Sequence, residues 1–140
     1  MVTNNMKAEL VKTYTASEVA SAIKDMAPLK APGSDGMPPL FYHTYWSDIG
    51  MHISQAVLSC LNSGFLLKSI NRTFITIIPK VKNLEGVTKF SPISLCNVIY
   101  KIISKVIANC LKPLLNSIIS KTQGTFTTDR LITDNILNCL

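Results

Sequence analysis

The residues that could do chemistry in this sequence are a serine between two glycines, in Gly33-Ser34-Asp35-Gly36, and carboxylates that stand alone. The serine does not have the spacing of a nucleophile elbow, and no histidine partner is indicated for it. Nucleotidyl transfer by two metal ions needs carboxylates that converge on ions about 3.5–4 Å apart. Because no Asp-x-Asp pair and no adjacent acids are present, the sequence predicts no catalytic residue and no metal site in this chain.

Cysteine usage and hydropathy indicate the compartment. The four cysteines have no C-x-x-C pair among them, and no secretory context is visible for a disulfide framework, so we expect reduced, mostly buried thiols. Residues 1–11 contain no apolar run of a signal peptide, and the apolar stretch Val98–Ile119 is interrupted by lysines and by Pro113. These features predict an intracellular protein, in the nucleus or the cytoplasm, that is neither secreted nor embedded in a membrane.

Positive charge is concentrated in the second half of the chain. Residues 1–67 contain four basic and five acidic side chains, whereas residues 68–140 contain ten basic and three acidic ones. A basic half with few acids is typical of a nucleic-acid contact, although a surface of solvated lysines would have the same composition. Only Arg72 and Arg130 are arginines. This favours contact with phosphates over bidentate reading of bases.

The elements that must position these charges are mostly helical. The capping-box pattern Thr15–Glu18 predicts a helix that ends before Pro28, and the Lys30–Pro38 segment has the composition of a turn-rich loop. A second helical region is predicted from Pro39 to Asn62, with a renewed cap at Ser47 partway along it and Gly64 beyond its end. We expect its aromatic side chains to pack in the core and not to form a surface on which bases stack. The cluster comprises Phe41, Tyr42, Tyr45 and Trp46.

The remaining elements are a short sheet and a long apolar helix. Thr73–Ile78 is rich in β-branched residues and predicts a strand, and Pro92–Leu95 predicts a second short extended segment. Asn97 is expected to cap a helix whose apolar pairs recur every four residues, and Pro113 is expected to begin a separate, shorter helix. With 140 residues, 47% of them hydrophobic, the chain is predicted to be an α+β protein of one-domain size. Its charged fraction of 16% is low, which indicates a large core or a partner that covers part of the surface.

Five motifs from Lys30 onward resemble the N-terminal part of the reverse transcriptase of plant LINE-type, non-LTR retrotransposons. The resemblance extends over about four-fifths of the chain, in order and at that family's spacing. The motifs are K-A-P-G-x-D-G-x-P at 30–38, F-Y-x-x-Y-W at 41–46, I-P-K at 78–80, F-x-P-I-S-L-C-N-V-x-Y-K-I-I-S-K-V-x-A-N-x-L at 90–111 and Q-x-x-F-x-x-x-R-L-I-T-D-N at 123–135.

The resemblance implies a mainly helical fingers subdomain of a right-hand polymerase with a short β-sheet, in which the palm is truncated. It divides the chain into an N-terminal helical segment, 1–29, and a partial reverse transcriptase domain of fingers and palm edge, 30–140. The implied ligand is an RNA template or an RNA–DNA hybrid. The positions that the resemblance assigns to nucleic-acid binding are Lys30, Gly33, Asp35, Gly36, Lys80, Lys89, Gln123 and Arg130.

Three departures from the family pattern weaken the implied contacts. Ser91 stands where the family has an arginine, Cys110 replaces another arginine, and Asp129 replaces a glycine. The catalytic aspartates of the family would follow Leu140, so this fragment is expected to have no cofactor, although the intact family enzyme would use Mg²⁺. We therefore expect a reverse-transcriptase fragment that does not polymerise by itself. Two alternatives remain open, a non-catalytic RNA- or DNA-binding module and an interaction piece that docks on a separate palm-containing polypeptide.

Overall fold

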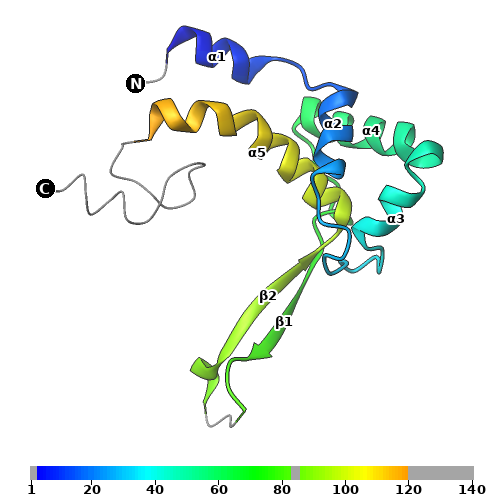
Figure 1. Ribbon diagram of the computed structural model, residues 1–140, viewed down its shortest axis with the longest axis vertical. Helices are drawn as coiled ribbons and strands as arrows, with labels where there is room; N and C mark the ends of the chain where they lie inside the picture. Colours follow the sequence, from blue (N-terminus) through cyan, green and yellow to red (C-terminus); the bar gives the residue numbers. More distant parts are fainter. Residues whose placement is uncertain (1–2, 83–85, 120–140) are drawn as a thin grey trace, which may run out of the picture. The chain divides into compact units, whose positions relative to one another are not determined.

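The computed structural model describes residues 3–82 and 86–119 of the chain (Figure 1). These residues form helices and one two-stranded sheet, an arrangement compatible with the α+β class. The elements in chain order are α1 (Asn4–Val11), α2 (Ala16–Lys24), α3 (Pro39–Thr44), α4 (Trp46–Ser63), β1 (Thr73–Pro79), the 3-10 turn η1 (Val87–Lys89), β2 (Phe90–Cys96) and α5 (Val98–Ile118).

The chain divides into two compact units. The larger unit comprises Tyr14–Lys105 and holds α2, α3, α4, both strands and the first two turns of α5. The other unit joins the N-terminal residues, with α1, to the chain beyond Lys105. Helix α1 was not predicted from the sequence. This helix has no buried residue, so its sequence contains no apolar stripe that would indicate a helix. Its N-terminus is capped instead by Thr3, whose hydroxyl accepts a hydrogen bond from the backbone N–H of Met6.

The core of the larger unit is built from one apolar face of each helix. Helices α2 and α4 pack together, and their residues Val19, Ala22 and Val57 are fully buried. Val98 and Ile102, one turn apart on α5, are fully buried as well, which accounts for the apolar repeat of four residues. The core therefore lies among the helices and leaves the two strands outside it.

Helix α2 begins where the sequence predicts. A carboxylate oxygen of Glu18 accepts hydrogen bonds from the Thr15 backbone N–H, at 2.7 Å, and from the Thr15 hydroxyl, at 2.8 Å. This contact satisfies an amide at the helix N-terminus that has no intrahelical partner. The predicted capping hydrogen bond from the Thr15 backbone N–H to the Glu18 carboxylate is thus confirmed.

The helical region after Pro38 is interrupted earlier than predicted. Tyr45, not Ser47, separates α3 from α4, because its backbone leaves the helical region at φ −102° and ψ 18°. Gly64 ends α4 in the left-handed conformation, at φ +70°, as the sequence indicates. The prediction of a buried aromatic cluster is correct for Tyr42 and wrong for Tyr45, which is 49% exposed.

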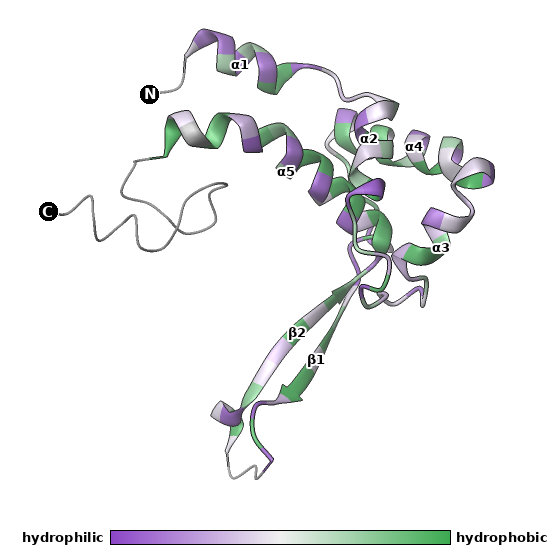
Figure 2. Ribbon diagram, viewed as in Figure 1, coloured by the Kyte–Doolittle hydropathy of each residue, from purple (hydrophilic) through white to green (hydrophobic). Residues whose placement is uncertain are grey.

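The two strands form an antiparallel hairpin whose register runs from Thr73↔Cys96 to Pro79↔Phe90. Both predicted strands are confirmed, and β2 is longer than the predicted segment. Side chains alternate between the two faces of the hairpin, so Ile75 and Ile77 share one face while Phe74 and Ile78 share the other. All four are exposed, and Figure 2 shows the hydrophobic colouring along β1.

Helix α5 corrects one prediction. Pro113 lies inside the continuous helix and does not begin a new one. Proline removes only one N–H donor, and helical bonding continues beyond it, with the Ile119 N–H donating to the Leu115 carbonyl.

The described cysteines are less buried than predicted. Cys60, Cys96 and Cys110 form no disulfide, but they are half-buried, not mostly buried. Cys139 lies outside the described residues. No helix in the described part of the chain has the length and hydropathy needed to cross a membrane.

Candidate nucleic-acid interface

The loop from Lys30 to Pro38 is shaped by two short-range hydrogen bonds. The Gly36 N–H donates to the Gly33 carbonyl at 3.2 Å and closes a tight turn, in which Gly36 has a φ of +71°. A carboxylate oxygen of Asp35 accepts from the Met37 N–H at 3.2 Å. The Asp35 carboxylate therefore folds back onto its own loop, as aspartate does in Asx turns.

Asn97 connects this loop to two other parts of the unit. Its side-chain oxygen accepts hydrogen bonds from the Ser34 hydroxyl, at 3.0 Å, and from the Asp35 backbone N–H, at 3.3 Å. Its side-chain nitrogen donates to the Ser69 carbonyl at 3.1 Å. Asn97 stands just before α5, as predicted, but these side-chain bonds run to the two loops and not to the N-terminus of the helix. Its role is to position the 30–38 loop.

Gly33 lies directly against the backbone of Asn97. A Cβ atom at position 33 would lie 2.3 Å from the Asn97 nitrogen and 2.5 Å from its Cα. Only a residue without a side chain permits this approach. The resemblance assigns Gly33 to nucleic-acid binding, and the structure places it in the contact between the loop and the residue that precedes α5.

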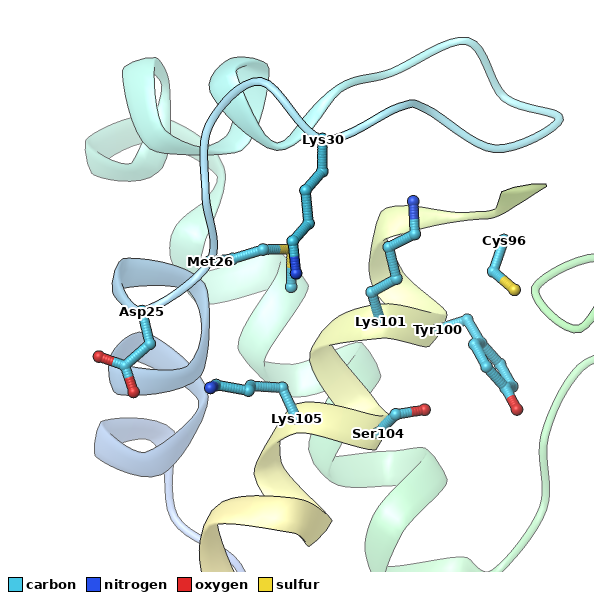
Figure 3. A pocket seen from close by; sticks show the side chains of 8 residues that line it. All are labelled: Asp25, Met26, Lys30, Cys96, Tyr100, Lys101, Ser104 and Lys105. Carbon is cyan, nitrogen blue, oxygen red and sulfur yellow. The ribbon is translucent and has the colours of Figure 1, made fainter. Parts of the chain in front are cut away.

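Lys30 belongs to a cationic cluster that sequence motifs do not bring together. It lines a pocket of about 390 Å³ with Lys101 and Lys105 of α5, and Asp25, Tyr100 and Ser104 share the same lining. Figure 3 shows Lys30 reaching from its loop into the space beside α5, and Lys105 extending toward Asp25. The Lys101 ammonium donates to the Ala31 carbonyl at 2.6 Å, which ties α5 to the loop.

Lys80 and Lys89 meet at the far end of the hairpin. The Lys80 N–H donates to the Lys89 carbonyl at 2.8 Å, and the Lys80 ammonium donates to the Thr88 carbonyl at 3.2 Å. Ser91 pairs with Ile78, two register positions from Lys80 and Lys89 and on the same face of the hairpin. An arginine at position 91, which the resemblance would place there, would add a third cation to this face.

The predicted site residues form two groups within the larger unit. One group contains Lys30, Gly33, Asp35 and Gly36, at the end of the hairpin where Thr73 pairs with Cys96. Lys80 and Lys89 lie at the opposite end, and a strand of seven residues separates the groups by about 20 Å. Gln123 and Arg130 lie outside the described residues.

Sequence reasoning missed Lys101, Lys105 and the positioning role of Asn97. The two lysines are four residues apart, a spacing that places side chains on one face of a helix and could have identified them. No local signal could place Lys30 beside them, because it is 71 residues before Lys101 in the chain. That contact depends on the loop being held against the start of α5.

The charged residues around these groups are almost all basic. From Lys68 to Lys105 the sequence contains seven basic side chains, and its one acid is Glu85. An ion pair joins Lys12 to Glu9 and lies in the other unit. The described residues also contain no cluster of three or more histidine, cysteine or acidic side chains that could hold a metal ion. The chemistry available here is attraction of anions.

Tyr42 makes the stability of the larger unit depend on pH in the alkaline range. Burial, together with the nearby Asp35 carboxylate, raises the pKa of Tyr42 from 10.0 to about 12. A pKa raised on folding stabilises the fold fully below pH 10, and this stabilisation is lost as the pH rises from 10 toward 12. A rise of this size corresponds to a loss on the order of 3 kcal/mol in the free energy of unfolding.

We therefore expect urea denaturation to show a loss of stability between pH 9 and pH 11.5 that is smaller in Tyr42→Phe. The phenylalanine variant differs from the wild-type protein only by the Tyr42 hydroxyl, so every other group contributes to both denaturation curves. An equal loss in the two proteins would show that Tyr42 is not the group responsible.

Comparison with known proteins relates the chain to a transposon-encoded protein. The chain is 29% identical over 136 residues to the "Transposon TX1 uncharacterized 149 kDa protein" of Xenopus laevis. The match covers 97% of this chain and 10% of that protein, so the chain spans one tenth of the relative's length. No family model matches the chain.

Proposed function

We propose that this chain is the template-binding fingers part of a reverse transcriptase encoded by a non-LTR retrotransposon, with its relatives among the plant LINE-type elements. It binds an RNA template or an RNA–DNA hybrid through phosphate contacts. The motifs from Lys30 to Asn135 and the similarity to a transposon protein over 97% of the chain support the proposed origin.

The observation that carries the binding proposal is the run of cations from Lys68 to Lys105, which forms both ends of the hairpin and the start of α5. A polynucleotide backbone is a line of regularly spaced negative charges, and lysines along an extended structure match it without reading sequence. The exposed hairpin supplies such an extended structure, with Lys80, Lys82 and Lys89 at its far end.

Polymerase activity is not part of this function. In the described residues the acids do not cluster into a metal-binding group, and the sequence has no adjacent carboxylates. Mg²⁺, the cofactor of the intact family enzyme, would have to be held by carboxylates of a palm. Template-dependent incorporation of deoxynucleotides by this chain alone would contradict the proposal.

The test is the salt dependence of binding to a labelled RNA–DNA hybrid, measured by fluorescence anisotropy between 50 and 200 mM salt. Each phosphate contact contributes close to 0.9 to the slope of log affinity against log salt, so Lys80→Gln/Lys89→Gln should reduce the slope by about 2. Arg130→Ala should also weaken binding, by the role that the resemblance implies.

The matched control is Lys7→Gln/Lys24→Gln, which removes the same charge from α1 and α2 and should leave the slope almost unchanged. A wild-type protein whose binding does not depend on salt, or does not saturate, would overturn the proposed function.

A second function is favoured by the hairpin surface. Ile75 and Ile77 are 72% and 62% exposed, and the other face also presents exposed apolar side chains. Two-stranded hairpins are marginal alone, and exposed apolar patches often mark protein contacts. The alternative is an interaction piece that docks this hairpin on a separate palm-containing polypeptide. Hybrid binding that required such a partner would favour this second function.

A further inference from the structure

We propose that the pocket between the 30–38 loop and α5 is a phosphate-binding site. Its lining residues include Lys30, Lys101 and Lys105. The inference rests on the proposed function, and it assigns this pocket to one backbone phosphate of the bound nucleic acid. The resemblance gives Lys30 alone such a role, and no sequence motif joins the three lysines.

Charge is the first argument. Three cations and one carboxylate, Asp25, line a single pocket, so its formal charge is +2. Lys101 and Lys105 stand one helical turn apart, where like charges on a helix repel each other. A bound phosphate would remove this repulsion and convert three like charges into attractive contacts. The ligand is therefore an oxyanion with more than one oxygen to share.

Hydrogen-bonding capacity is the second argument. An ammonium group has three donors, and the Lys101 ammonium uses one of them on the Ala31 carbonyl. Tyr100 and Ser104 add two hydroxyl groups to the same lining. In Figure 3 Lys30 and Lys105 lie on one side of α5, while the hydroxyl groups of Tyr100 and Ser104 point to the other side. The donors of Lys30 and Lys105 are therefore the ones that can bind the same phosphate.

The size of the pocket is the third argument. A volume of about 390 Å³ lies in the range of about 300–1,000 Å³ that is typical of small-molecule sites. A single inorganic phosphate would leave much of it empty, whereas a phosphate with its attached sugar would fill more. The phosphate could belong to a polynucleotide or to a free nucleotide, and the experiment must separate these two sources.

The first arm measures hybrid binding by Lys101→Gln/Lys105→Gln. Loss of one phosphate contact should lower the salt slope by about 1, and Lys101→Arg/Lys105→Arg should restore it because both charges return. Lys7→Gln/Lys24→Gln removes two exposed lysines that lie outside the pocket and outside the run from Lys68 to Lys105, and it is the matched control. Circular dichroism of each variant verifies that it is folded.

The second arm uses the wild-type chain, so it does not depend on how a variant folds. Lysine acetylation is mapped by mass spectrometry with no ligand, with the hybrid, and with inorganic phosphate or deoxynucleoside triphosphate. Protection of Lys30, Lys101 and Lys105 by the hybrid, with Lys7 and Lys24 still reactive, is the expected result.

The outcomes separate the two proposals. If the hybrid binds through Lys80 and Lys89 while the pocket lysines stay reactive and the slope of Lys101→Gln/Lys105→Gln is unchanged, the pocket inference is overturned and the proposed function stands. If the hybrid does not bind but a free nucleotide protects the pocket lysines, phosphate binding stands and the assignment to a polynucleotide is overturned, together with the proposed function. If the hybrid does not bind and no ligand protects the pocket lysines, both proposals are overturned.

Discussion

Replacing Gly33 by alanine is expected to destabilise the larger unit by about 3 kcal/mol, at the upper end of the range for overpacking. The added Cβ would lie 2.3 Å from the backbone nitrogen of Asn97, so a side-chain rotation cannot relieve the contact. The loop or the start of α5 must move instead. The measurement is urea denaturation followed by circular dichroism, and the midpoint should fall clearly.

Gly36→Ala is the matched control for this experiment. Gly36 lies in the same loop with a φ of +71°, but no atom lies within 4 Å of the position of its added Cβ. Alanine there meets only the strain of the left-handed conformation, about 1–2 kcal/mol. Equal losses at positions 33 and 36 would show that the close approach to Asn97 does not limit stability.

Replacing Asn97 by alanine is the second change with a large expected effect. Asn97 is 7% exposed, and its side chain makes three hydrogen bonds to Ser34, Asp35 and Ser69. Each such bond contributes about 0.5–1.5 kcal/mol, so the loss should be about 2–4 kcal/mol in the free energy of unfolding. Hybrid binding should weaken as well, because the loop that carries Lys30 is no longer held on α5.

Two further variants separate the contributions of Asn97. Ser34→Ala removes one of the three hydrogen bonds and should cost about 1 kcal/mol. Asn97→Asp keeps the oxygen that accepts from the loop but replaces the donor to the Ser69 carbonyl by an oxygen, so it should be intermediate at neutral pH. If Asn97→Ala were no worse than Ser34→Ala, Asn97 would not be the residue that positions the loop.

Local patterns predicted most of the secondary structure. The capping box, the β-branched run and the period-four apolar pairs each depend on neighbouring residues, and α2, β1, β2 and the start of α5 follow them. The errors arise where local rules compete. Pro113 is a good first residue of a helix, yet the surrounding helix continues through it. Helix α1 has no apolar stripe, so periodicity could not find it.

Some features of the candidate site could be predicted from the sequence, and others could not. The sequence by itself determined the charge of the second half of the chain and the lack of clustered carboxylates, because these follow from residue type alone. It also carries the motifs that resemble a reverse transcriptase.

Only the tertiary structure decided which lysines lie near one another. Lys80 and Lys89 meet because the hairpin register joins them, and Lys30 meets Lys101 and Lys105 because Gly33 and Asn97 hold the loop against α5. Contacts between distant segments depend on packing and on buried hydrogen bonds, and no local pattern of residues encodes either. The sequence therefore determined that the surface attracts anions, and the fold determined where on the surface the cations gather.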